Sequence, residues 1–371
     1  MTQSVIEGTQ ISSVELKIRP ARVKDTHVQD RIFWMILRFI SWSMIAIMAA
    51  IFILLLKLSF TSLAKFGFGF FSGTDWNPPL DIFGALPFIY GTVLSSLLAI
   101  LVAAPVSIGV ALFLTQLAPK PLRTTVAFLV EMLAAIPSVV YGLWGVFILV
   151  PFMQTFVQPK LIHFLGPGST FAALAAKLLT ALVYPFILIF QVFRLNFDGW
   201  SLEQTSQMMM HFSNQIFAGP AYGVGLLTAS LILAIMITPT ISSISREVFA
   251  SVPSQEREAA LALGATRWEM IRLSVIASCK SGILGAVILG LGRALGETMA
   301  VTMVIGNRNE IKPAILAPAQ SMASVIANEY NEASGLHLSS LVGIGLSLLV
   351  ISLLVNSIAR FTIWRVERVK K

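Results

Sequence analysis

EREAALALGATRWEMIRLSVIASCKSGILGAVILGLGRALGETMAVTMVIGN, residues 256–307, joins a polar, helix-forming segment directly to an apolar one. The apolar part, about 281–304, is long enough to cross a bilayer, yet it carries Arg293 and Glu297 near its middle. A charge in the bilayer core costs about 2.5–3.5 kcal/mol on insertion scales, so it is expected to face a partner or a wet pathway. A polar docking surface joined to such a helix is an arrangement for driving something polar across a membrane.

The composition of the chain favours a membrane protein. Of its 371 residues, 56% are hydrophobic and 12% are charged, whereas soluble globular proteins carry about 25% charged residues. The net charge is +8, but the basic residues collect beside the apolar runs, so nucleic acid is not expected as a partner. The single cysteine excludes an intrachain disulfide, and the four scattered histidines lack metal-ligand spacing, so no metal site is expected.

The apolar runs predict an all-α polytopic membrane protein with six transmembrane helices. Their approximate ranges are 33–56, 90–117, 125–150, 222–244, 281–304 and 338–358. The first run is too long for a cleaved signal peptide and is expected to be a retained anchor. Pro105 and Pro137 predict kinks in the second and third helices. The predicted organisation is an N-terminal tail at 1–32, a transmembrane domain at 33–358 and a basic tail at 359–371.

The basic residues predict the topology. The positive-inside rule assigns the loops 118–126 and 245–280 and both tails to the cytosol. An even number of crossings between residues 150 and 223 satisfies all four assignments, although the run 171–193 is apolar and long enough to span. The segment 151–221 is therefore expected to be a long outer-side loop or a re-entrant segment of a multi-pass protein with both termini in the cytoplasm.

The cytosolic segment 245–280 contains a small, strongly helical surface. Ala259 and Ala260 favour a helix that a partner can approach closely, and Glu258 lies in its first turn, where the helix dipole favours an acid. Gly264 is expected to end this helix so that a second one can start.

This pattern resembles the EAA loop of the membrane subunits of ABC importers, whose two short helices dock into a cleft on the ATPase. In that family the pattern continues with I-x-L-P, and here residues 274–277 read SVIA, so the proline is missing. The resemblance implies the fold of type I ABC importer permeases. It also implies that Glu258, Ala259, Ala260 and Gly264 belong to the helix that couples to the ATPase.

Three other stretches resemble the phosphate-specific permease family PstC. They are FGALPFIYGTVLSSLLA (83–99), VEMLAAIPSVVYGLWG (130–145) and LGLGRALGETMAVTMVIGN (289–307). The likeness extends over nearly all six helices, and its main departure is a longer segment at 155–215. It implies the permease subunit of an ATP-driven ABC importer of inorganic phosphate in the bacterial inner membrane.

The resemblance also implies the partners. They are a PstA-like second permease, a dimer of PstB-like ATPases, a PstS-like phosphate-binding protein on the outer side, and membrane lipid. The chain has no G-x-x-x-x-G-K-[ST] sequence, so ATP and Mg are expected on the partner ATPase, with no cofactor on this chain. The sequence shows no His/Asp/Ser arrangement and no metal-ligand arrangement of the kind that catalysis needs. The chain is therefore expected to be a transporter subunit and not an enzyme.

Arg293 and Glu297 are the candidate residues of the substrate pathway. Four residues apart, they are expected to share one face of the fifth helix, with Arg293 about 18 Å from its inner end at about 1.5 Å per residue. We expect Arg293 to balance the charge of phosphate, and Glu297 to orient Arg293 or to accept a hydrogen bond from a protonated phosphate. A purely structural Arg–Glu pair is the alternative, although Arg before Glu is the less favourable order. Glu131 is expected to be interfacial.

Two other functions stay open. The same machinery could carry another oxyanion, such as sulfate, molybdate or tungstate. An ion-driven secondary transporter or channel would need no ATPase, but its usual inverted repeats with paired broken helices are not evident.

Overall fold

The computed structural model describes residues 27–170, 173–174, 177, 180 and 202–368. By contacts the chain divides into two units, Met1–Leu54 and Leu55–Lys371. The described part of the first unit is the N-terminal portion of one long helix, α1 (His27–Phe66), which begins inside the predicted tail 1–32. All other described elements belong to the second unit.

The second unit is helical apart from one very short hairpin among its described residues. The hairpin pairs β1 (Trp76–Asn77) with β2 (Ile82–Phe83) in antiparallel register, Trp76 opposite Phe83. The helices are α2 (Gly69–Ser72), α3 (Leu86–Leu112), α4 (Lys120–Ala135), α5 (Ser138–Trp144), α6 (Val150–Phe152), α7 (Gln158–Leu165), α9 (Leu202–Ile216), α10 (Leu226–Ala250), α11 (Ser254–Ala262), α12 (Arg267–Met270), α13 (Lys280–Leu295), α14 (Met299–Val304), α15 (Met322–Glu329) and α16 (Gly335–Arg368). Short π-helical turns continue α3, α5, α6 and α12.

The expected six-helix membrane architecture is confirmed. Five described helices are long and apolar enough to cross a membrane, and they cover Asp30–Phe66, Leu86–Leu117, Ser138–Leu165, Leu226–Ala250 and Gly335–Arg365. The sixth is a bent pair, Arg267–Ile276 and Lys280–Leu295, whose two parts meet at 74°. α16 continues to Arg368, well into the predicted tail 359–371.

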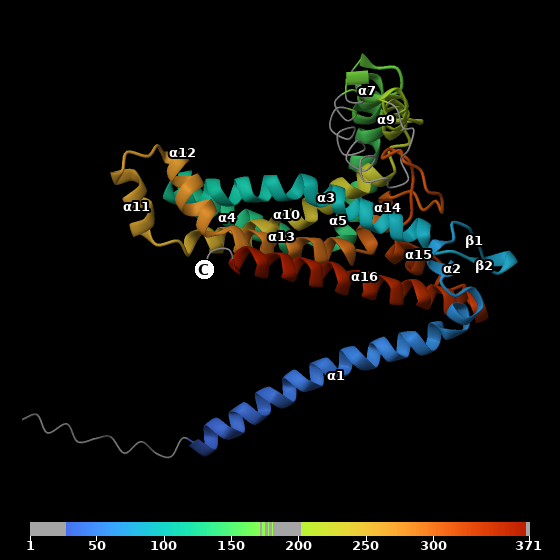
Figure 1. Cartoon of the computed structure of the whole chain (residues 1–371), viewed down its shortest axis with the longest axis horizontal. Coiled ribbons are helices and arrows are strands. Elements are labelled where there is room, and N and C mark those ends of the chain that lie inside the picture. Colours follow the sequence, from blue (N-terminus) through green and yellow to red (C-terminus); the bar gives the residue numbers. More distant parts are fainter. Residues whose placement is uncertain (1–26, 171–172, 175–176, 178–179, 181–201, 369–371) are drawn as a thin grey trace, which may run out of the picture. The chain divides into compact units, whose positions relative to one another are not determined.

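The core of the second unit forms around α10. This helix packs against α3, α4, α13 and α14, and Figure 1 shows α3, α10, α13 and α16 running alongside one another. Its fully buried Ile232, Leu233 and Ile237 contact a cluster that includes Ala99 and Ala103 of α3. Small residues on α3 let the two helices approach closely, which is how membrane helices gain packing energy.

A glycine on α3 allows one such close approach. A Cβ at Gly91 would lie 2.1 Å from the carbonyl oxygen of Gln320, just before α15. We expect Gly91→Ala to lower the free energy of unfolding by about 1–3 kcal/mol, because the backbone of one segment must shift. The thermal unfolding midpoint of the purified protein in detergent measures this effect. Gly109→Ala on the same helix is the control, since a Cβ there meets nothing within 4 Å, and equal midpoints would contradict the expectation.

The predicted bounds of the third transmembrane helix, 125–150, are wrong. The chain is extended at Ile136 (ψ 129°) and Pro137 (ψ 141°), so α4 ends at Ala135 and a new helix starts at Ser138. Proline disfavours helical backbone at the residue before it and lacks the N–H that a continuous helix needs. Pro137 therefore breaks the helix, whereas Pro105 stays within α3.

Because the third membrane-length helix starts at Ser138 and not at residue 125, the predicted loop 151–221 also changes. Its first part is helical, because the membrane-length helix that starts at Ser138 runs on to Leu165. α9 occupies a second part and leads back towards α10. Most of the apolar run 171–193, predicted to be re-entrant or interfacial, lies outside the described residues.

Candidate functional site

Arg293 lies in the last turn of α13, half-buried among the helices of the bundle. Its Nη1 donates a hydrogen bond of 3.0 Å to Oγ1 of Thr240 on α10. It also lies close enough to the phenol of Tyr141 on α5 to act on it electrostatically. Three helices therefore meet around one guanidinium group.

The positive charge of Arg293 is not neutralised by a described neighbour. Among the ion pairs of the described residues, none involves Arg293. A guanidinium has five N–H donors, and Thr240 is its one side-chain acceptor in the part of the chain that the structure describes. A cation held inside an apolar bundle without a carboxylate is suited to bind an anion.

Glu297 does not lie on the same helix as Arg293. α13 ends at Leu295, Gly296 follows with non-ideal backbone angles (φ −92°, ψ 0°), and α14 starts at Met299. The carboxylate of Glu297 accepts a hydrogen bond of 3.2 Å from the N–H of Ala300. The prediction of one continuous helix through Arg293 and Glu297 is therefore wrong: Glu297 sits in a break and caps the following turn.

The predicted coupling segment forms two short helices joined by a tight turn. Glu258, Ala259 and Ala260 lie on α11, and Gly264 follows with φ +86°. Figure 1 shows α11 and α12 at one end of the bundle, away from the β1–β2 hairpin. The structure thus brings all four predicted residues into one helix–turn unit.

Two large apolar side chains are highly exposed on this mostly polar helix–turn unit. Leu263 is 90% exposed and Trp268 is 62% exposed. Exposed large apolar side chains grouped on a polar segment mark a protein-binding surface. Sequence reasoning missed both residues; the signal was available in their position on either side of the glycine turn.

The helix–turn unit contacts the chain just before the helix that carries Arg293. A capping box starts α12, in which Thr266 Oγ1 accepts from the N–H of Glu269, and the Glu269 carboxylate accepts from the N–H of Thr266. Ser278 donates to the carboxylate of Glu256, 3.3 Å away, which holds α11 against the start of α13. The segment that begins with α12 and the helix α13 meet at a bend of 74°.

Glu131 lies apart from Arg293. Its carboxylate pairs with Arg246 and joins α4 to α10, with the glutamate side chain 53% exposed. An exposed ion pair between two helices is a structural contact of small energy.

Comparison with known proteins gives consistent matches. Residues 103–368 match the family described as "Binding-protein-dependent transport system inner membrane component". "Phosphate transport system permease protein PstC" of Mesorhizobium japonicum is 43% identical over 350 residues, which cover 94% of each chain. The protein of the same name from Pasteurella multocida is 41% identical over 342 residues, which cover 92% of this chain and 94% of that one. A solved bacterial ABC transporter involved in the import of the acidic polysaccharide alginate matches with a TM-score of 0.44 and 17% identity, covering 92% of this chain and 97% of that chain.

Proposed function

This chain belongs to the family of binding-protein-dependent transport system inner membrane components, and from this premise we propose that it is the permease subunit of an ATP-driven importer of inorganic phosphate. The observation that carries the substrate assignment is the guanidinium of Arg293, held by Thr240 inside the bundle and without a described carboxylate partner. The names of the similar permeases support phosphate as the anion.

The proposed substrate pathway passes Arg293. A guanidinium presents paired N–H donors that match two oxygens of a phosphate group. Glu297 acts by holding the break that precedes α14, through its hydrogen bond to Ala300. α13 ends at Leu295, two residues after Arg293, so the proposed approach to Arg293 is from the side of α14.

The proposed energy source is an ATPase on separate chains. α11 and α12 would dock into it with Leu263 and Trp268, and closure of the ATPase dimer on ATP and Mg would tilt α13. The proposed complex contains a PstA-like second permease, two PstB-like ATPases and a PstS-like binding protein. The basic loop 245–280 and the basic C-terminal residues support a cytoplasmic location for the docking segment and for both termini.

The experiment that tests the substrate is competition during uptake. Proteoliposomes that contain the whole complex, ATP inside and loaded binding protein outside are given labelled phosphate with excess sulfate or molybdate. Uptake that resists both competitors is the expected result. Uptake that either competitor blocks would assign the machinery to another oxyanion.

The threonine that anchors Arg293 gives a further prediction. Thr240→Val keeps the volume of the side chain but removes the acceptor for Nη1, so Arg293 loses its fixed position. A hydrogen bond to a charged group contributes about 1.5–3 kcal/mol, so we expect phosphate uptake to fall about tenfold. Thr238→Val on the same helix is the control, because its hydroxyl bonds only to the carbonyl of Ala234 among described partners. Equal uptake by the two variants would contradict a positioning role for Thr240.

A further inference from the structure

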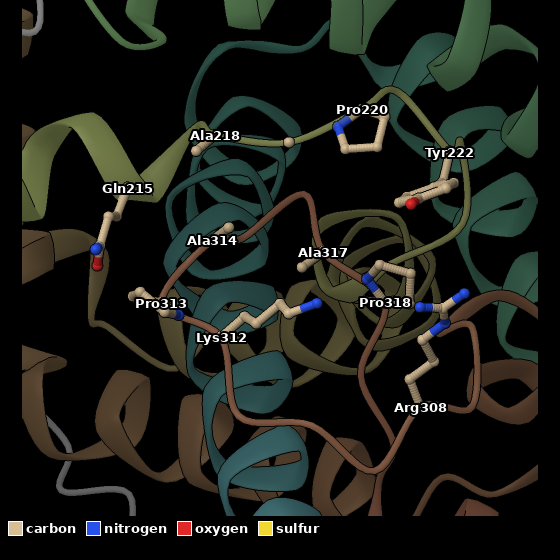
Figure 2. Close-up of a pocket in the computed structure, with 11 residues that line it drawn as sticks. Gln215, Ala218, Pro220, Tyr222, Arg308, Lys312, Pro313, Ala314, Ala317 and Pro318 are labelled. Carbon is tan, nitrogen blue, oxygen red and sulfur yellow. The ribbon is translucent and has the colours of Figure 1, made fainter.

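A cavity of about 340 Å³ lies beyond the end of α14. It is formed by two segments far apart in sequence, 215–222 at the end of α9 and 308–318 after α14. Its polar lining includes Gln215, Tyr222, Arg308 and Lys312. Figure 2 shows the side chains of Arg308 and Lys312 extending from the same loop, with their charged ends on either side of Pro318.

The walls of this cavity are fixed by backbone hydrogen bonds. The N–H of Arg308 donates to the carbonyl of Ala319 (3.2 Å), and that of Ile315 donates to the carbonyl of Ile216 (2.9 Å). The N–H of Leu226, at the start of α10, donates to the carbonyl of Ala317 (3.1 Å). The cavity is therefore a built feature at the junction of α9, α10 and α14.

The loop 305–334 brings two cations to the cavity. On the proposed topology, the loop faces the outer side, where the positive-inside rule makes lysine and arginine scarce. Residues 305–334 contain two such side chains, Arg308 and Lys312, and both line the cavity. Arg308 and Lys312 differ from Lys65 and Lys160, which also lie on the proposed outer side, because both line one cavity and can act together on an anion.

A neighbouring acid offsets one of the two charges. Glu310 pairs with Lys312, and the hydrogen bond and charge of Lys312 hold the pKa of Glu310 below its usual range. Glu310 therefore stays ionised at neutral pH, and the group of three keeps one net positive charge. Arg308 lies close enough to Glu310 to act on it electrostatically, but it forms no ion pair among the described residues, so its N–H groups can donate to a ligand.

We propose that this cavity is a reception site for an oxyanion, with Arg308 and Lys312 as its ligands. The proposal rests on the proposed function and deepens it: inorganic phosphate binds here after release on the outer side and then moves past α14 to Arg293. The route follows α10: Leu226, which bonds to the cavity wall, and Thr240, which holds Arg293, are fourteen residues apart on this helix, about 21 Å at about 1.5 Å per residue. A phosphate headgroup of a lipid has the same chemistry and is distinguished by experiment.

The first test is uptake by the reconstituted complex with Arg308→Gln/Lys312→Gln. At limiting loaded binding protein, we expect phosphate uptake to fall about tenfold, as for loss of charge-assisted hydrogen bonds, while ATPase stimulation by the binding protein persists. Lys65→Gln/Lys160→Gln is the control, since it also removes two cations on the proposed outer side but none from the cavity.

Each other outcome of this test has a distinct meaning. If the wild-type complex transports no phosphate, the proposed function itself fails. If the wild type transports phosphate and the double variant does so equally, the reception site is overturned. Loss of ATPase stimulation together with uptake would also overturn it, because the cations would then serve binding-protein docking.

The second test identifies the ligand. The amine of Lys312 is acylated in the complex reconstituted in phosphatidylcholine, with and without inorganic phosphate, and the modified lysines are quantified by mass spectrometry. We expect phosphate to protect Lys312 and not Lys160. Protection that appears only when anionic phospholipid is added would overturn the proposal in favour of a lipid headgroup.

Discussion

Replacement of Arg293 by alanine is expected to lower ATP-driven phosphate uptake by about two orders of magnitude while the complex still assembles. Loss of one partner of a buried charge pair costs about 2–5 kcal/mol, and here the lost partner is the one that would neutralise phosphate. Assembly is expected to survive, because no described carboxylate pairs with Arg293 and none is left buried without its counter-charge.

One further variant at this position separates the effect of charge from that of geometry, and a variant elsewhere serves as control. Arg293→Lys keeps the charge but loses the planar paired donors, so its uptake is expected to lie between those of the wild type and Arg293→Ala. Arg360→Ala is the control, because Arg360 lies exposed near the end of α16. Normal phosphate uptake by Arg293→Ala would remove Arg293 from the substrate pathway.

Gly264→Val is expected to uncouple the chain from its ATPase. Gly264 has φ +86°, a backbone conformation that costs a β-branched residue about 1–3 kcal/mol. A Cβ there meets nothing within 4 Å, so the effect comes from the backbone alone. The turn between α11 and α12 is then strained, so the positions of Leu263 and Trp268 on the two helices are expected to change.

The measurement is co-purification of the ATPase with the membrane subunits, followed by ATP-driven uptake. We expect at least a tenfold loss of both, at about 1.4 kcal/mol per factor of ten, with an unchanged yield of the membrane subunit. Gly285→Val is the matched control, since a Cβ there is equally unobstructed and the residue lies within α13. Full ATPase recovery with Gly264→Val would show that this turn is not part of the docking surface.

The number of membrane helices could be predicted from the sequence, but the points where they break could not. Hydropathy is averaged over a window of residues, so the average for 281–304 stays apolar although Gly296 and Glu297 lie within it. At the break, the Glu297 carboxylate accepts a hydrogen bond from the N–H of Ala300, a contact that spacing alone does not reveal. At Pro137 the chemistry of the break was visible, but a tolerated kink such as that at Pro105 has the same sequence signal.

The candidate site was predicted in part for similar reasons. Arg293 stood out because charge is costly in an apolar run, and the coupling segment stood out by its motif. Thr240 could not be found, because a threonine on another helix becomes a partner only through the packing of α10 against α13. The cavity near Arg308 joins segments about ninety residues apart, and only the backbone hydrogen bonds between them bring them together.

The most direct test of the central proposal is accumulation of labelled phosphate in proteoliposomes that contain the purified complex with loaded binding protein outside. ATP inside is compared with a non-hydrolysable analogue, at equal total phosphate concentrations on both sides at the start. An ATP-driven importer is expected to concentrate phosphate inside with ATP and to leave it at equilibrium with the analogue. Equal movement of phosphate under both conditions would contradict the proposal and assign the chain to a channel or secondary transporter.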